Sequence, residues 1–245
     1  MAASWRVEQR RGTASALHAG WPTVERWPEV AAIGVCTPQA PAVVLGSTQS
    51  EQVVDEARAS AAGIEVARRR SGGGAVLVTP DDPVWIDVWV PAAHPLWRLD
   101  VAHAFDWLGD AWADALTSIG RAGLVAHRQG YLACTRWSGL VCFGGVGTGE
   151  VVTPAGRKVV GLAQRRNRAG AWFHGACVLH WDPALLVDVL ALHPDERVAA
   201  VEDLAQAVVG VRDLADSGDL RVGSGRQSVD REVVVAALIG SLLTR

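Results

Sequence analysis

The segment PVWIDVWVP (83–91) constrains the fold most, because its pattern is that of a β-strand. Four β-branched residues alternate along it with Trp85, Asp87 and Trp89, and a proline stands near each end. A period of two is the repeat of a strand, and prolines are typical of strand ends. The segment therefore predicts a strand that carries large side chains on both faces.

Strand-like and helix-like segments alternate irregularly along the rest of the chain. Short β-branched runs predict strands at 31–37, 41–47 and 63–69, and a second sheet region at 122–128, 138–145, 158–164 and 171–180. Apolar residues at helical spacing predict helices at 51–62, 101–120, 183–192, 201–209 and 231–243. In the longest of these, Asp100 can cap the start and Gly120 can end the helix. This order predicts an α+β fold with mixed or antiparallel sheets flanked by helices.

Composition limits the class of protein. The 245 residues are 49% hydrophobic and show no internal repeat, so we expect one domain over 1–245. A net charge of −3 provides no global field for nucleic acid or an anionic membrane. The N-terminus lacks the apolar run of a signal peptide, and no apolar stretch reaches the roughly 20 residues of a membrane span. We expect a cytoplasmic protein.

The cysteines and the lysine are each informative. The four cysteines stand singly without C-x-x-C spacing, so we expect no zinc site and buried free thiols.

Lys158 is the only lysine among 23 basic residues. Lysine is a compact ammonium on a flexible stem, whereas arginine is a planar fork with several donors. The stretch alone leaves two interpretations open, a site that needs one ammonium and a surface lysine retained by chance.

The glycine-rich run RRRSGGGAV (68–76) is the strongest local signal. Three consecutive glycines let the backbone approach a ligand closely with its N–H groups pointing inward. Neighbouring arginines can clasp a phosphate through paired hydrogen bonds. The run lacks the Gly-Lys-Ser/Thr ending of a Walker A loop and the G-x-G-x-x-G spacing of a dinucleotide fold. It predicts an anion site, with a hairpin turn as the alternative.

Four motifs in order resemble the lipoate–protein ligase family, within the superfamily of biotin–protein ligases and octanoyltransferases. They are PAVVLGSTQS (41–50), RRRSGGGAV (68–76), GRKVVGLAQRR (156–166) and FHGACVL (173–179). The resemblance implies a catalytic domain of the biotin/lipoate ligase type. It also implies that Lys158 has a function.

The resemblance implies a two-step reaction. Lipoate or octanoate is activated with Mg²⁺-bound ATP as an acyl-AMP, and the acyl group passes to a lysine of a lipoyl carrier domain. Such carriers belong to 2-oxoacid dehydrogenase complexes or are the glycine-cleavage H protein. The resemblance makes Lys158 the catalytic residue, with no protein-held metal, and gives these binding residues: Arg69, Ser71, Gly72, Gly73, Gly74, Ala75, Val76, Leu77, Gly161 and His174.

The sequence departs from the family pattern at three points. LVTPDDPVW (77–85) stands where the family has His-Asp and then Gly-Asn. Val160 replaces a smaller residue before Gly161, which suggests a narrower pocket. We also expect no C-terminal accessory domain of the kind that larger ligases carry. Adenylation would then need a separate accessory protein, or would not be this protein's reaction.

Other functions remain open. Some relatives transfer octanoyl groups without ATP through a cysteine thioester, but Cys142 and Cys177 lie in apolar runs without a neighbouring base, which favours inert thiols. A biotin ligase ranks last, because the G-R-G-R-x-G-R loop is absent. A catalytically silent binding protein would tolerate arginine at position 158. Arg165, Arg166 and Arg168 would steer an acidic carrier domain or form a solvated turn.

Overall fold

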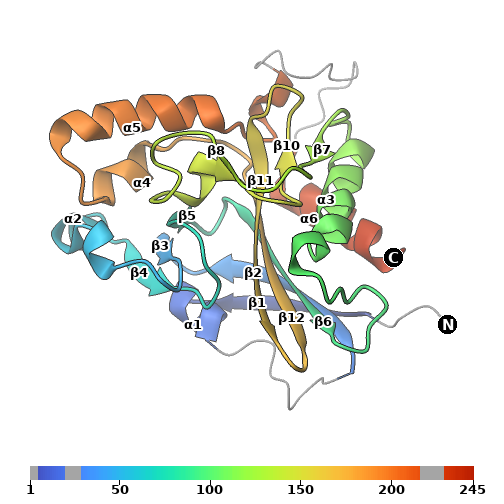
Figure 1. Cartoon of the computed structure of the whole chain (residues 1–245). Coiled ribbons are helices and arrows are strands. Elements are labelled where there is room, and N and C mark those ends of the chain that lie inside the picture. The colour runs from blue at the N-terminus through green and yellow to red at the C-terminus, as the bar shows by residue number, and fades with distance from the viewer. Residues whose placement is uncertain (1–4, 20–28, 216–228) are drawn as a thin grey trace.

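A computed structural model describes residues 5–19, 29–215 and 229–245. A seven-stranded mixed sheet forms its centre (Figure 1). In spatial order its strands are β1 (Trp5–Gly12), β2 (Ala31–Pro38), β6 (Val84–Pro91), β12 (Gly170–Cys177), β11 (Lys158–Asn167), β10 (Val151–Val152) and β7 (Val125–Ala126). The first two strands pair in parallel and all other neighbours are antiparallel.

A smaller sheet and several helices lie around this centre. The small sheet has the order β4 (Glu65–Arg68), β3 (Ala42–Leu45) and β5 (Val76–Val78), and a further pair is β8 (Leu132–Ala133) with β9 (Gly145–Val146). The α-helices are α1 (Ala14–Ala19), α2 (Glu56–Ala61), α3 (Asp106–Ser118), α4 (Ala184–Val189), α5 (Pro194–Ala207) and α6 (Arg231–Leu243). In the described ranges, 3-10 helices span Glu51–Val53, Val101–His103, Cys142–Gly144 and Asp213–Ala215.

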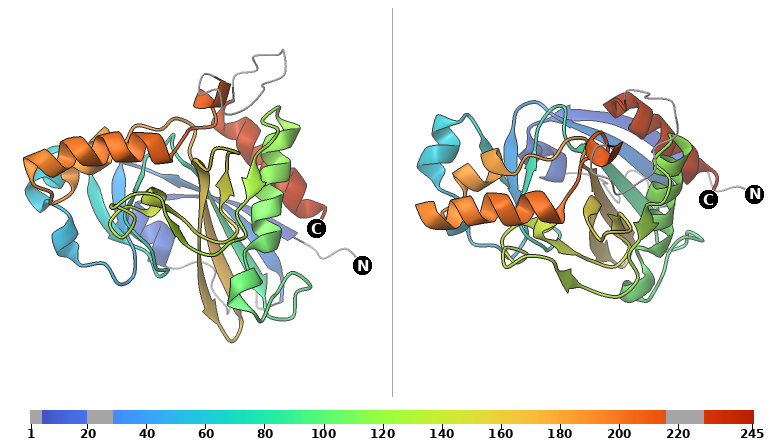
Figure 2. Two further views of the ribbon diagram at one scale, coloured as in Figure 1. Left: turned by 45° about the horizontal axis from the view of Figure 1, so that its top comes forward. Right: turned by 90° about the horizontal axis from the view of Figure 1, so that it is seen from above.

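The segment 83–91 is the two-sided strand that its pattern predicts. All eight residues of β6 are buried. Val84, Ile86, Val88 and Val90 join the main core, which α3 and α6 cover on one face of the sheet (Figure 2). On the other face, Trp85 packs into a separate cluster with residues of α1 and the small sheet. Asp87 lies on the same face as Trp85 and accepts a hydrogen bond from its ring, and its other partners are described with the site.

The helices are confirmed in position, with shifted ends. α3 begins at Asp106, and its N-cap residue Phe105 makes no side-chain capping bond, so Asp100 does not cap it. Gly120 follows the helix with φ of +82°, the left-handed conformation expected of a terminating glycine. The helix predicted at 51–62 is shorter, because the Asp55 side chain accepts a hydrogen bond from Arg58 N at 3.1 Å and starts α2. The helix predicted at 231–243 matches α6.

Two predictions about the sheets are wrong. The segments 122–128, 158–164 and 171–180 belong to one sheet with β6, because β6 pairs with β12 along its whole length. The segment 138–145 is mostly turn and 3-10 helix, not a strand. Its carbonyl oxygens at Cys142 and Gly145 accept hydrogen bonds from the Lys158 side chain.

No helix in the described part of the chain is both long and apolar enough to cross a bilayer.

Two helix glycines predict opposite effects of the same substitution. A Cβ at Gly109 in α3 would lie 2.2 Å from the Gly149 carbonyl oxygen, whereas one at Gly240 in α6 would meet nothing within 4 Å. Gly240→Ala should raise the free energy of unfolding by about 0.5–1 kcal/mol through helix propensity. Gly109→Ala should lower it by about 1–3 kcal/mol through overpacking. Urea denaturation of both variants checks this, and a gain from Gly109→Ala would contradict the close approach of α3 to Gly149.

Candidate active site

The glycine loop lies between β4 and β5, and Arg69 holds its shape. The Arg69 side chain is buried and donates to the carbonyl oxygens of Val44 at 3.1 Å and of Gly72 and Gly74 at 2.8 Å each. Gly73 has φ of +100°, which a residue with a side chain rarely adopts. Arg69 is thus anchored to the loop backbone, and its contact with a phosphate stays a prediction.

The loop presents free backbone donors. In the described part of the chain, the amides of Gly72, Gly73 and Gly74 donate to no backbone or side-chain acceptor. The Ser71 hydroxyl is also buried without a partner among the described residues. Successive N–H groups without acceptors form a concave site for an anion. The anion site predicted from RRRSGGGAV therefore has the donors that it needs.

The far side of the loop is bonded to the segment that contains Cys142. Ala75 N donates to Leu140 O at 2.7 Å, and Cys142 N donates to Ala75 O at 2.9 Å. A Cβ at Gly74 would lie 2.6 Å from the Val141 carbonyl carbon, so this contact requires glycine. The glycine loop and the Cys142 segment, which are far apart in sequence, are thereby joined side by side.

Lys158 starts β11 and is 1% exposed. Its ammonium lies 2.7 Å from Glu150 Oε2 and donates to Cys142 O at 2.9 Å and Gly145 O at 3.0 Å. Burial opposes its charge, but the Glu150 carboxylate outweighs burial and holds the pKa of Lys158 above its usual value. The only lysine is therefore a charged, fully buried group, which excludes a surface lysine retained by chance.

Sequence reasoning missed Glu150, the partner of this lysine. Its Oε1 accepts from Leu162 N at 2.9 Å and its Oε2 accepts from Gly147 N at 2.7 Å. One carboxylate thus ties the 142–150 loop to β11 and neutralises the ammonium. The sequence carries no local signal for this pair, because it is the pairing of β10 with the start of β11 that brings Glu150 to Lys158.

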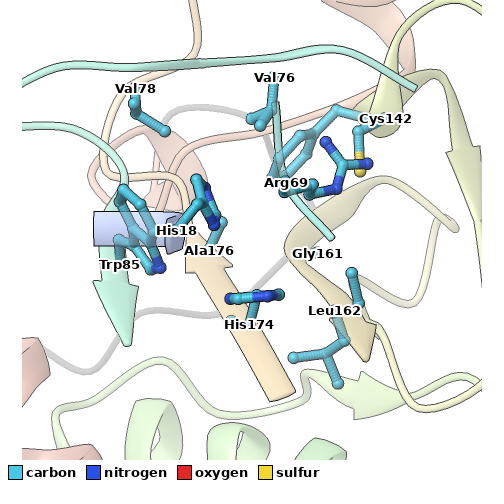
Figure 3. A pocket seen from close by; sticks show the side chains of 13 residues that line it. His18, Arg69, Val76, Val78, Trp85, Cys142, Gly161, Leu162, His174 and Ala176 are labelled. Carbon is cyan, nitrogen blue, oxygen red and sulfur yellow. The ribbon is translucent and has the colours of Figure 1, made fainter. Parts of the chain in front are cut away.

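Two cavities meet at Cys142. The first, about 50 Å³, is lined almost entirely by apolar surface between β5, β11 and β12 (Figure 3). The second, about 190 Å³, lies between the glycine loop and Lys158. Cys142, Leu162 and Ala163 line both. Gly161 and His174 line the first cavity, and their part in binding stays a prediction. Val160 lines neither cavity and does not narrow them.

The two cysteines of the sequence analysis differ. Cys177 is fully buried, and burial raises its pKa far above the usual value, as expected of an inert thiol. Cys142 is only partly buried and borders both cavities. The inference that Cys142 is inert is not supported by this position.

A buried polar network closes the other end of the first cavity. Asp87 is inaccessible and accepts from Trp85 Nε1 at 2.6 Å, from Arg10 Nη1 at 3.1 Å and from His174 Nδ1 at 2.7 Å. Burial opposes its ionisation, but the attraction and hydrogen bond of His174, with contributions from His18 and the Arg10 guanidinium, hold the pKa of Asp87 below its usual value. The sequence pointed to His174 alone, because the other members come from β1, α1 and β6.

The remaining charged residues have other roles. Asp82, in the segment that replaces the family's His-Asp and Gly-Asn, accepts from Leu179 N at 2.9 Å and His180 N at 2.8 Å. Arg166 stacks over Trp97 at 4.2 Å, and Arg165 and Arg168 are exposed near the turn between β11 and β12. No group of three or more His, Cys, Asp or Glu in the described residues could hold a metal ion.

The buried ion pair predicts a large effect of removing its negative charge. Glu150→Gln keeps the shape but leaves the buried Lys158 ammonium without its counter-charge, and should lower the free energy of unfolding by about 3 kcal/mol. The control is Glu51→Gln, because Glu51 pairs with Arg68 at 3.3 Å on the surface and should contribute under about 1 kcal/mol. Equal effects in urea denaturation would contradict the assigned importance of the buried pair.

His18 predicts a loss of stability in weak acid. Burial lowers its pKa to about 3 from 6.5, with His174, Arg69 and Arg10 adding to the effect and Asp87 opposing it. Below pH 6.5 the unfolded chain takes up a proton that the folded chain excludes, so stability present above that pH is lost as pH falls. His18→Gln cannot titrate. Between pH 7 and pH 5 the wild type should lose about 2 kcal/mol more than the variant in urea denaturation, and parallel losses would contradict the burial of His18.

Comparison with known proteins identifies the family. A family model described as the lipoyl protein ligase A/B catalytic domain matches residues 28–240. Octanoyltransferase LipM of Kyrpidia tusciae is 31% identical over 166 residues, which is 66% of this chain and 59% of that protein. The chain thus matches less than two thirds of the length of this curated relative.

Solved structures share the fold. A bipartite lipoate protein ligase from Thermoplasma acidophilum, studied with its E2 lipoyl domain, has a TM-score of 0.71 at 21% identity, over 99% of this chain and 82% of that chain. A lipoate-protein ligase A bound with ATP has a TM-score of 0.68 at 20% identity, over 99% and 84% respectively. These matches confirm the predicted α+β fold. The chain belongs to the lipoyl protein ligase A/B catalytic domain family.

Proposed function

We propose that this protein is an acyltransferase that moves an octanoyl or lipoyl group onto a lysine of a lipoyl carrier domain through a thioester on Cys142. The observation that carries this proposal is the place of Cys142. Its thiol lies where the apolar cavity meets the cavity of Lys158 and the glycine loop. An acyl chain in the first cavity would bring its carbonyl carbon to the sulfur.

The reaction has two balanced steps. The Cys142 thiolate attacks the thioester carbonyl of an acyl donor, a new C–S bond forms, and the donor thiolate leaves and takes up a proton. The ε-amine of the carrier-domain lysine then attacks the Cys142 thioester, an amide forms, and Cys142 leaves with the proton that the amine releases. Both steps develop negative charge on the carbonyl oxygen, which fixed positive charge and N–H groups stabilise.

The residues around Cys142 supply that stabilisation. The Lys158 ammonium has three donors and three acceptors within hydrogen-bonding distance, so it acts through its charge and by fixing the 142–150 loop. The free amides of Gly72, Gly73 and Gly74 border the same cavity and can receive the oxyanion. His174 and the apolar walls of the first cavity bind the acyl chain and exclude water from it.

Two further observations favour transfer without ATP. The relative that is 31% identical to this chain is named an octanoyltransferase. In the segment that replaces the family's His-Asp and Gly-Asn, Asp82 is bonded to two backbone amides and is not free to serve a nucleotide or its Mg²⁺.

An ATP-dependent ligase is the second candidate, and the glycine loop favours it. The unpaired Ser71 hydroxyl and the free amides of the loop are suitable donors for a phosphate of ATP. Lipoate or octanoate would then be activated as acyl-AMP, with Mg²⁺ entering as the counter-ion of ATP. A separate accessory protein would complete the reaction, and the carrier domain would be the same.

A cysteine substitution separates the two functions. Wild-type protein incubated with an octanoyl carrier-protein thioester and no ATP should gain one octanoyl group by intact mass, sensitive to hydroxylamine, and pass it to a lipoyl domain. Cys142→Ser should lower transfer by more than about 100-fold, since the nucleophile is lost. Cys134→Ser is the control, because Cys134 is exposed and lines neither cavity.

The ligase has its own readout. Pyrophosphate release from Mg²⁺-bound ATP with lipoate or octanoate, undiminished in Cys142→Ser, together with no acyl-enzyme in the wild type, would overturn the transferase and favour the ligase.

A further inference from the structure

Two buried histidines border the apolar cavity at the side away from Cys142. His18 is 5% exposed and His174 is 7% exposed, and their ring centroids lie 5.0 Å apart. Figure 3 shows His18 with Trp85 on one side of the cavity and Cys142 with Arg69 on the other. The surface between them is apolar, so the two rings are the polar feature at that end.

Each ring has one nitrogen without a partner. His174 Nε2 and His18 Nδ1 are buried and have no hydrogen-bond partner among the described residues. His174 Nδ1 donates to Asp87 Oδ1 at 2.7 Å, so in the neutral ring Nε2 is an acceptor. His18 is stacked on Trp85 with centroids 4.5 Å apart, and its free nitrogen can donate. One end of the cavity thus offers a donor and an acceptor close together.

We propose that His18 and His174 form a subsite for a hydroxyl or thiol group near the end of the acyl chain, so that the enzyme prefers such chains to a plain alkyl chain. This inference rests on the proposed function only in taking the cavity as the acyl site. One O–H or S–H group can accept from His18 Nδ1 and donate to His174 Nε2. A methyl end can do neither and leaves both nitrogens unpaired.

The electrostatics of the site suit a neutral polar group. Burial and the nearby His174, Arg69 and Arg10 lower the pKa of His18 to about 3, against the opposing effect of Asp87, so His18 is neutral at physiological pH. The Asp87 carboxylate already accepts hydrogen bonds from Trp85, Arg10 and His174, so it does not require a proton from the ligand. A hydroxyl or thiol fits this end, whereas a carboxylate would meet the Asp87 charge behind His174.

Binding of free acids tests the subsite without any transfer step. Isothermal titration calorimetry would compare octanoic acid, the hydroxyoctanoic acids with the hydroxyl on one of the last three carbons, and dihydrolipoic acid. At least one hydroxyl or thiol acid should bind about 10-fold or more tightly than octanoic acid. Octanoic acid leaves the buried His18 and His174 nitrogens without a partner, and this lowers its affinity by about that factor. Equal or tighter binding of octanoic acid than of every polar acid overturns the inference, as does no binding of any acid.

Three variants assign the preference to the histidine. His18→Phe keeps the stacking on Trp85 but removes the nitrogen. The ratio of the affinity for the polar acid to that for octanoic acid should therefore fall toward 1. His18→Gln keeps a hydrogen-bonding group and should retain part of it. Val78→Ala changes the same cavity wall without a polar atom, so it should alter the affinity for all acids together. A preference unchanged in His18→Phe overturns the assignment, and so does a preference lost equally in Val78→Ala. Neither result affects the acyl-enzyme test on Cys142, so the two proposals fail separately.

Discussion

The buried ion pair between Lys158 and Glu150 is the interaction on which the site depends. A lone ammonium inside the protein would be strongly unfavourable, and a carboxylate at 2.7 Å with two backbone carbonyls makes it stable. Those carbonyls belong to Cys142 and Gly145, so the same charge that completes the site also folds the loop that carries the cysteine. One set of contacts therefore holds both the ammonium that borders the second cavity and the loop that carries Cys142.

A second polar centre lies at the opposite end of the apolar cavity. Asp87 extends from the central strand β6 and receives donors from β1, from β6 itself and from β12. The two centres differ in kind. The Lys158 centre is ionic and its donors are saturated, whereas two imidazole nitrogens at the Asp87 centre have no partner among the residues that the structure describes. In the proposed function, the carbonyl of the acyl chain would lie at the ionic end of this cavity and the end of the chain at the histidines.

The glycine loop connects this arrangement to the fold. It is the link between the small sheet and the Cys142 segment, through hydrogen bonds of Ala75 with Leu140 and Cys142. Arg69 is used to hold the loop backbone. Among the described residues the amides of Gly72, Gly73 and Gly74 have no acceptor, so the proposed anion site of this motif relies on the loop backbone and not on the Arg69 side chain.

The sequence by itself determined the elements whose signals are local. The period of two at 83–91, the helical spacing at 231–243, the glycine run and the solitary lysine all identify their elements or residues, and four motifs in order indicate the family. Only the tertiary structure decided which strands share a sheet, that Glu150 neutralises Lys158, that Cys142 stands between two cavities, and that Asp87 meets His174 across 87 positions of sequence. The physical reason is that burial and charge pairing depend on neighbours brought together by strand pairing, and a sequence pattern encodes a residue's periodicity but not its partners.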